Sequence, residues 1–127
     1  MVTQVDAGAL RAMLGHGWVP TFAPVALGLA DNLSYNVNAD MVAQAVAAAL
    51  GDAELLFVTN VPGVMLEGAV VPRLTRDDVQ AAIASGAISG GMVPKVRAAL
   101  DALDAGAASA RITNLAGVAA GGTAVTP

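Results

Sequence analysis

The only lysine of the chain, Lys95, ends the glycine-rich stretch SGGMVPK at residues 89–95. Glycines ahead of a helix expose free backbone N–H groups and allow close approach, so a phosphate fits there. A lysine in the first helical turn is mildly unfavourable, because the helix N-terminus already carries partial positive charge. A bound anion would remove that penalty, so the stretch indicates a phosphate site. The alternative is a solvated surface lysine that follows an ordinary loop.

Two other segments place polar side chains beside the start of a predicted helix or the end of a predicted strand. In YNVNAD, residues 35–40, two asparagines alternate, and Asp40 falls in a first helical turn where it can hold a cationic side chain. In TNVPGV, residues 59–64, a polar pair and a Pro-Gly turn let the backbone approach a flat ring or a phosphate. Purely structural roles also fit, with Asn38 as a helix cap, Asp40 as a partner of the helix dipole, and an ordinary strand-ending turn.

Composition limits the other chemistry that the chain can perform. Hydrophobic residues make up 56% of the 127 residues and aromatic ones only 3%, so the core must rest on aliphatic contacts. A net charge of −4 without a basic run argues against a nucleic acid partner. With no cysteine and one histidine, we assign no metal site. The apolar stretch at 41–61 is interrupted by polar residues and no signal peptide is evident, so we expect a cytoplasmic protein without a membrane partner.

The elements that must position these residues follow from caps, breakers and apolar periodicity. We expect helices over residues 6–15, 39–50, 75–85 and 91–105, strands over 18–25, 54–61 and 108–115, and a hairpin around Gly68. Residues 26–37 are expected to form a mixed loop, and Trp18 and Tyr35 to have packing roles. The nearly continuous apolar run at 54–61 predicts a strand covered on both faces.

Helices alternate with short apolar strands, without an internal repeat or a long linker. This order predicts one α/β domain over residues 1–127, with a mostly parallel sheet and helices on its faces. Ligands of such sheets bind at the carboxyl ends of the strands. We therefore expect the three polar segments to meet at that edge.

Together, four segments resemble the carboxyl-terminal half of the N-acetylglutamate kinases, within the amino acid kinase family. They are YNVNAD, FVTNVPGV, AISGGMVPK and GGTAV, which begin at residues 35, 57, 87 and 121. Their order and spacing both match, and the resemblance extends over nearly the whole chain from about Val5. It implies a three-layer αβα sandwich, and transfer of the γ-phosphoryl group of MgATP to the side-chain carboxylate of N-acetyl-L-glutamate in arginine biosynthesis. ATP and Mg²⁺ are thus the implied cofactors.

The resemblance also implies a role for each matching residue. Lys95 would stabilise the transferring phosphoryl group, and Asp40 would hold the catalytic lysines in place. Asn36 would bind the acylated amino acid, with Asn38 close by. The positions that match nucleotide contacts are Thr59, Asn60, Val61, Pro62, Gly63, Val64 and Met65, followed by Ala87, Ile88, Ser89, Gly90 and Gly91.

The chain also departs from the family pattern. The family's Lys-x-Gly-Gly stretch, second glycine-rich phosphate loop and substrate-binding arginine have no match, and the last helix is almost deleted between Leu115 and Gly121. We therefore expect no catalysis by this chain alone, and a homo-oligomer or a complementing chain that covers the exposed sheet edge. Asn60 replaces the usual aspartate, as in kinases of carrier-bound aminoadipate, which leaves a related acidic substrate open. The other alternative is a non-catalytic nucleotide-binding or interaction module.

Overall fold

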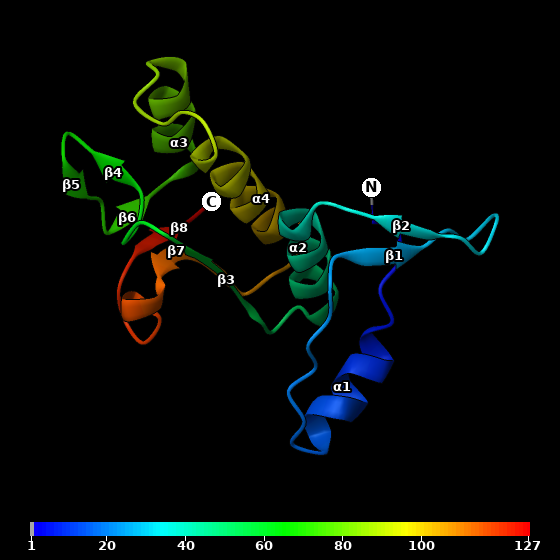
Figure 1. Cartoon of the computed structure of the whole chain (residues 1–127). Helices are drawn as coiled ribbons and strands as arrows, with labels where there is room; N and C mark the ends of the chain where they lie inside the picture. The colour runs from blue at the N-terminus through cyan, green and yellow to red at the C-terminus, as the bar shows by residue number, and fades with distance from the viewer. Residues whose placement is uncertain (1) are drawn as a thin grey trace.

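The computed structural model describes residues 2–127 (Figure 1). The helices are α1 (Ala7–Gly15), α2 (Ala39–Leu50), α3 (Arg76–Ala84), α4 (Met92–Asp104) and the 3-10 turn η1 (Leu115–Gly117). The strands are β1 (Val25–Leu27), β2 (Ser34–Asn36), β3 (Glu54–Thr59), β4 (Met65–Leu66), β5 (Ala69–Val70), β6 (Arg73–Leu74), β7 (Ser109–Asn114) and β8 (Thr123–Val125). Within this part of the chain, every helix is too short or too polar to cross a bilayer.

A four-stranded sheet with the order β3-β7-β8-β6 forms the centre of the molecule. β3 runs parallel to β7, and β6 runs parallel to β8, whereas β7 and β8 are antiparallel. The register of β3 and β7 places Thr59 opposite Asn114, so the carboxyl ends of both strands lie side by side. The predicted α/β class with a mostly parallel sheet is confirmed.

Helices α2 and α4 lie side by side and cover one face of this sheet (Figure 1). Burial alternates along β3 and β7, because successive strand residues point to opposite faces. The residues that face the helices are buried, namely Leu55, Phe57, Ala110 and Ile112. Burial of each large aliphatic or aromatic side chain contributes about 1.5–3 kcal/mol. This face therefore supplies most of the driving force that docks the two helices.

Local signals set the helix ends where the sequence predicts them. The Asn38 side chain accepts a hydrogen bond from the Met41 N–H and caps α2. Thr75 and Asp78 form a reciprocal capping box at the start of α3. The hydrogen bonds from Thr75 to the Asp78 carboxylate, first from its hydroxyl and then from its N–H, lower the pKa of that carboxyl. The predicted hairpin is confirmed as well, with Glu67 and Gly68 both at positive φ in its turn.

The prediction for residues 18–37 is wrong. No strand forms over residues 18–24, because Pro20 and Pro24 each lack the N–H that a strand ladder needs. Instead β1 begins directly after Pro24 and pairs antiparallel with β2, inside the segment expected to be a loop. Trp18 and Tyr35, for which we expected packing roles, are 64% and 48% exposed.

The prediction that β3 is covered on both faces is also wrong. Val58 is 51% exposed and Leu56 is half-buried, because α2 and α4 pack on the opposite face of β3, where Leu55 and Phe57 are buried. The continuous apolar run therefore leaves apolar surface on the opposite face.

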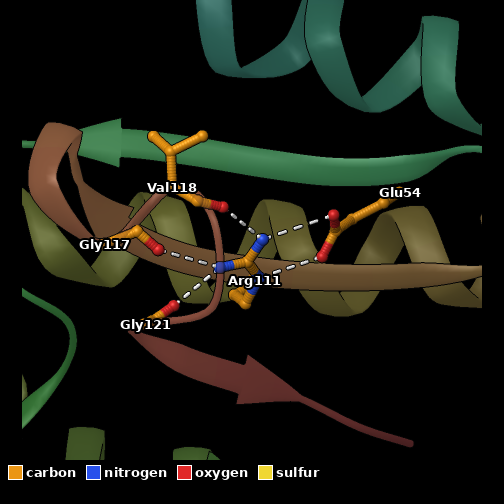
Figure 2. A network of polar contacts seen from close by, with 5 residues as sticks. All are labelled: Glu54, Arg111, Gly117, Val118 and Gly121. Atoms are coloured by element: carbon orange, nitrogen blue, oxygen red, sulfur yellow. Dashed lines mark hydrogen bonds and ion pairs between the residues drawn. The ribbon is translucent and has the colours of Figure 1, made fainter.

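Arg111 organises that opposite face (Figure 2). Its side chain, 17% exposed, pairs with Glu54 at 3.0 Å and donates to the carbonyls of Gly117, Val118 and Gly121 at 3.2, 2.9 and 2.7 Å. These carbonyls belong to the segment 115–121, in which the structure has only the short turn η1. The planar guanidinium thus satisfies carbonyls that a longer helix would have paired internally.

Replacement of Arg111 by methionine tests this clamp, because it keeps a long unbranched side chain but removes all four partners. We expect the free energy of unfolding to fall by about 2 kcal/mol, since partly shielded carbonyls and Glu54 lose their donor. Urea denaturation followed by circular dichroism measures the change. The control Arg97→Met, at an exposed position of α4, should cost less than about 0.5 kcal/mol. Equal losses for both variants would contradict the clamp.

Candidate functional site

Lys95 and Asp40 form an ion pair between the amino ends of α4 and α2. The Lys95 Nζ lies 3.0 Å from both carboxylate oxygens of Asp40. The two side chains are 24% and 21% exposed, so solvent screens the pair only in part. The hypothesis that Asp40 can hold a cationic side chain therefore has a specific partner in the structure.

Phe57 lies beneath this ion pair. The Lys95 Nζ is 5.4 Å from the centroid of the Phe57 ring, within the range of a cation–π contact. Phe57 is itself 5% exposed and stands two residues before the end of β3 at Thr59. The contact links the start of α4 to the carboxyl end of β3. Sequence analysis missed Phe57, and its only signal was that it is an aromatic residue in a chain with very few.

The electrostatics of the pair change the argument made from the sequence. The partial positive charge at the start of α4 opposes Lys95, while the same charge at the start of α2 favours Asp40. Asp40 supplies the anion that the lysine needs for stability, so a phosphate is not required to explain Lys95. The pair nevertheless keeps a cation fixed and partly exposed next to two helix N-termini, which is an arrangement suited to an anionic ligand.

The loop before α4 is open at its glycines and anchored by one apolar side chain. Gly90 has φ +56°, and a Cβ on Gly90 or Gly91 would meet no atom within 4 Å. The N–H groups of Met92 and Val93, the first two residues of α4, donate to the carbonyls of Ser89 and Gly90 at 3.3 Å. Fewer N–H groups are therefore free than the sequence suggests. Ile88 is 3% exposed and belongs to the core, whereas Ala87, Ser89, Gly90 and Gly91 are exposed.

The loop that follows β3 has an exposed start and a buried end. The Thr59 hydroxyl donates to the Asn60 side-chain oxygen at 3.2 Å, and Asn60 and Pro62 are exposed. Val64 is 1% exposed, and its N–H donates to the hydroxyl of Thr123 at 2.8 Å. Between these ends of the loop, Val61 is half-buried and Gly63 is buried. Met65, which follows Val64, is 44% exposed.

The two asparagines of YNVNAD are not joined to the ion pair. The oxygen of the Asn38 side chain is used in the cap of α2. Asn36 ends β2, where it is exposed and paired with Val25. Among the polar contacts described for residues 2–127, none connects either asparagine side chain to Lys95. The structure thus unites Lys95, Asp40 and the end of β3, and leaves the asparagines at the edge of this cluster.

Comparisons with known proteins identify the family of the chain. A model of the amino acid kinase family matches residues 1–114. The chain belongs to the amino acid kinase family. An acetylglutamate kinase of Chloroflexus aggregans is 65% identical over 123 residues, which are 97% of this chain and 48% of that protein. The chain therefore spans about half the length of the curated relatives that it matches.

Two solved structures are similar to this chain in fold. The structure of smu.665 from Streptococcus mutans UA159 has a TM-score of 0.86 at 33% identity, over 98% of this chain and 49% of that one. An N-acetylglutamate synthase from Neisseria gonorrhoeae has a TM-score of 0.82 at 20% identity, over 98% of this chain and 31% of that one, and shows the fold alone. The resemblance seen in the sequence is thereby confirmed for the family and for the fold.

A double-mutant cycle with Asp40→Asn and Lys95→Met measures the strength of the ion pair. We expect a coupling energy of about 1 kcal/mol in the free energy of unfolding, because the pair is mostly shielded and both oxygens are engaged. The side chains of Arg76 and Asp104 are 34% and 57% exposed, so the matched cycle at this pair should give a smaller coupling energy, about 0.3 kcal/mol. Both cycles use chemical denaturation. A coupling at Asp40 and Lys95 no larger than at the exposed pair would show that the contact is weak in solution.

Proposed function

We propose that this chain forms the nucleotide-binding half of an acetylglutamate kinase. The intact enzyme would transfer the γ-phosphoryl group of MgATP to the side-chain carboxylate of N-acetyl-L-glutamate, in arginine biosynthesis in the cytoplasm. One observation carries the proposal: Asp40 fixes the only lysine of a chain that is 65% identical to an acetylglutamate kinase. Phosphoryl transfer needs such positioned cations more than covalent chemistry.

Each part of the site has a proposed role that fits its geometry. Lys95 stabilises negative charge on the transferring group, and Asp40 holds Lys95 in place. The loops 59–65 and 87–91 contact the nucleotide at their exposed positions, and Asn36 and Asn38 contact the substrate. The exposed positions are Asn60, Pro62, Met65, Ala87, Ser89, Gly90 and Gly91, whereas Gly63, Val64 and Ile88 are buried and support the two loops. MgATP supplies the phosphoryl group. No three side chains of His, Cys, Asp or Glu gather as a metal site in residues 2–127, so we assign the magnesium mainly to phosphate oxygens and water.

We further propose that this half does not catalyse alone. The chain covers 48% of the Chloroflexus aggregans relative, and the family's other phosphate-binding segments have no match in it. A second substrate class follows from Asn60, which is exposed where the family usually has aspartate. Phosphorylation of carrier-bound aminoadipate instead of N-acetyl-L-glutamate, measured on a complemented enzyme, would favour that second class.

Calorimetric titration with MgATP and MgADP tests the nucleotide site directly. We expect Lys95→Ala to weaken MgATP binding about tenfold, which is roughly 1.4 kcal/mol, because a charge-assisted contact to the phosphate is lost. The effect on MgADP should be smaller, since Lys95 is assigned to the transferring group. Arg97→Ala removes the same charge two residues away on an exposed part of α4 and should leave both affinities unchanged.

The possible outcomes separate the proposals. If Lys95→Ala and Arg97→Ala weaken binding equally, the effect is one of net charge and the role of Lys95 is wrong. If the parent chain binds neither nucleotide, the nucleotide-binding half is wrong and an interaction module is favoured. Saturable acyl-phosphate formation by the chain alone would overturn the proposal that it is inactive by itself.

We also propose that a partner, either a complementing chain or a second copy, covers the surface of α1, the segment after it and the β1–β2 hairpin. Large apolar side chains are exposed over these elements, which extend away from the sheet (Figure 1). They are Met13, Leu14, Trp18, Val19, Phe22, Val25, Leu27, Leu29 and Leu33. A groove of about 460 Å³ lies among them, lined in part by α1, β1 and α2. Exposed apolar side chains that gather around a groove are typical of a contact with another protein surface.

Trp18, the only tryptophan, reports on this contact. We expect light scattering to show a dimer or a larger assembly, and Trp18 fluorescence to shift to shorter wavelength as the protein concentration rises, because the indole ring leaves water. Trp18→Tyr gives the baseline for the fluorescence. A monomer with solvent-exposed Trp18 at high concentration would contradict self-association, and co-expression with the missing half of a relative would then test the complementing chain.

A further inference from the structure

One buried hydroxyl group connects three separate parts of the molecule. Thr123, at the start of β8, is 0% exposed. Its Oγ1 accepts a hydrogen bond from the Val64 N–H at 2.8 Å and donates to the Val71 carbonyl at 2.5 Å. Val64 ends the loop that follows β3, and Val71 follows β5. The hydroxyl thus uses its proton and a lone pair on two backbone groups that come from opposite sides of the β4–β5 hairpin.

The register of the hairpin shows what the hydroxyl replaces. Met65 pairs with Val70 and Leu66 with Ala69, so Val64 and Val71 would form the next pair along the ladder. An antiparallel pair of this type normally exchanges two N–H···O bonds. Val71 does donate to the Val64 carbonyl at 2.9 Å, but the Val64 N–H and the Val71 carbonyl are bridged by the Thr123 hydroxyl. The side chain is therefore inserted into the hairpin ladder at its open end.

Gly63 and Thr123 are in direct contact at the same point. A Cβ on Gly63 would lie 2.8 Å from the Thr123 Oγ1 and 3.2 Å from its backbone N. Packing against Thr123 therefore requires a glycine at position 63. Sequence analysis had instead ascribed this glycine to the close approach of a ligand. The contacts of Gly63 and Val64 with Thr123 fix the end of the loop 59–65 to the start of β8.

Thr123 is itself placed by rigid backbone. Gly122 has φ +100°, and a Cβ there would lie 2.3 Å from the Ile112 carbonyl oxygen, so only glycine fits. The carbonyl of Gly121, the residue before it, accepts a hydrogen bond from Arg111 at 2.7 Å. The position of the hydroxyl therefore does not depend on the loop that it holds.

We infer that Thr123 is a positioning residue for the nucleotide loop 59–65, in which its hydroxyl bridges the Val64 N–H and the Val71 carbonyl. The inference rests on the proposed nucleotide site. Loss of the hydroxyl leaves both backbone groups without a partner in a water-poor environment, so the loop end opens more often. Nucleotide binding then weakens, although Thr123 is assigned no contact with the nucleotide.

The neighbouring strand offers a matched control. Thr113, on β7, is also 0% exposed, and its Oγ1 has no hydrogen-bond partner in the part of the chain that the structure describes. Thr113→Val and Thr123→Val delete the same atom from equally buried sites in one sheet. Only the second change removes hydrogen bonds, so the comparison isolates them from the loss of a buried hydroxyl.

The experiment compares Thr123→Val, Thr123→Ser and Thr113→Val with the parent chain in two measurements. Hydrogen exchange of the Val64 amide, followed by NMR without nucleotide, should be about tenfold faster in Thr123→Val. MgATP affinity from calorimetry should fall several-fold in the same variant. Thr123→Ser, which keeps the hydroxyl, should restore both values towards those of the parent, and Thr113→Val should match the parent in both.

The outcomes decide the inference even if one variant fails. Equal exchange rates and MgATP affinities in Thr123→Val and the parent would overturn it. If Thr123→Val does not fold, the parent chain still decides, because a Val64 amide that exchanges as fast as exposed loop amides would overturn the bridge. If the Val64 amide of the parent exchanges slowly but the parent binds no MgATP, the proposed nucleotide site is wrong. The exchange rates of the variants alone then decide whether the Thr123 hydroxyl fixes the loop.

Discussion

The close packing of α2 against α4 is the constraint on which the rest of the structure depends. Alanines are buried in both helices: Ala99 and Ala102 of α4 are completely buried and Ala47 of α2 is 5% exposed. Small side chains let the two helix axes approach, and the pair then covers β3 and β7 as one layer. The same approach brings two helix N-termini together, which is why Asp40 and Lys95, 55 residues apart, can meet at 3.0 Å. A larger side chain at Ala99 would separate the helices and the ion pair together, because an overpacked core relaxes by moving its backbone.

Most of what the sequence predicted correctly was encoded locally. Asn38, the Thr75–Asp78 capping box and the Glu67-Gly68 turn each act within a few residues, and all three are found where they were expected. The errors arose where distant parts of the chain decide. The coverage of β3 depends on which face α2 and α4 pack against, and the β1–β2 hairpin depends on a pairing that its prolines obscured. Within the site, the pairing of Asp40 with a cation was anticipated, whereas Phe57, Arg111 and Thr123 were missed. The partners of Thr123 are 52 and 59 residues away, so no spacing along the chain could show them.

The ion pair with Asp40 is compatible with both a structural role and a functional role for Lys95. Asp40 stabilises Lys95 in the folded chain, which is sufficient as a structural role, and the same contact fixes the ammonium group beside the end of β3. Membership of the amino acid kinase family is the reason why we propose the second role as well. In the proposed function, this site holds the nucleotide while a surface elsewhere on the chain contacts a partner. The exposed apolar side chains of α1 and the β1–β2 hairpin lie on such a surface.

The Arg111 clamp also bears on how the connection between β7 and β8 can change in length. The guanidinium holds the carbonyls of Gly117, Val118 and Gly121, while Ala119 and Ala120 between them are exposed. Both ends of the turn are thus fixed to β7, and its tip is free. Each doubling of a flexible loop costs only about 0.6 kcal/mol in closure entropy. Residues inserted at the tip would therefore leave the register of the sheet intact, so the clamp makes this turn a permissive point at which the protein can acquire new segments.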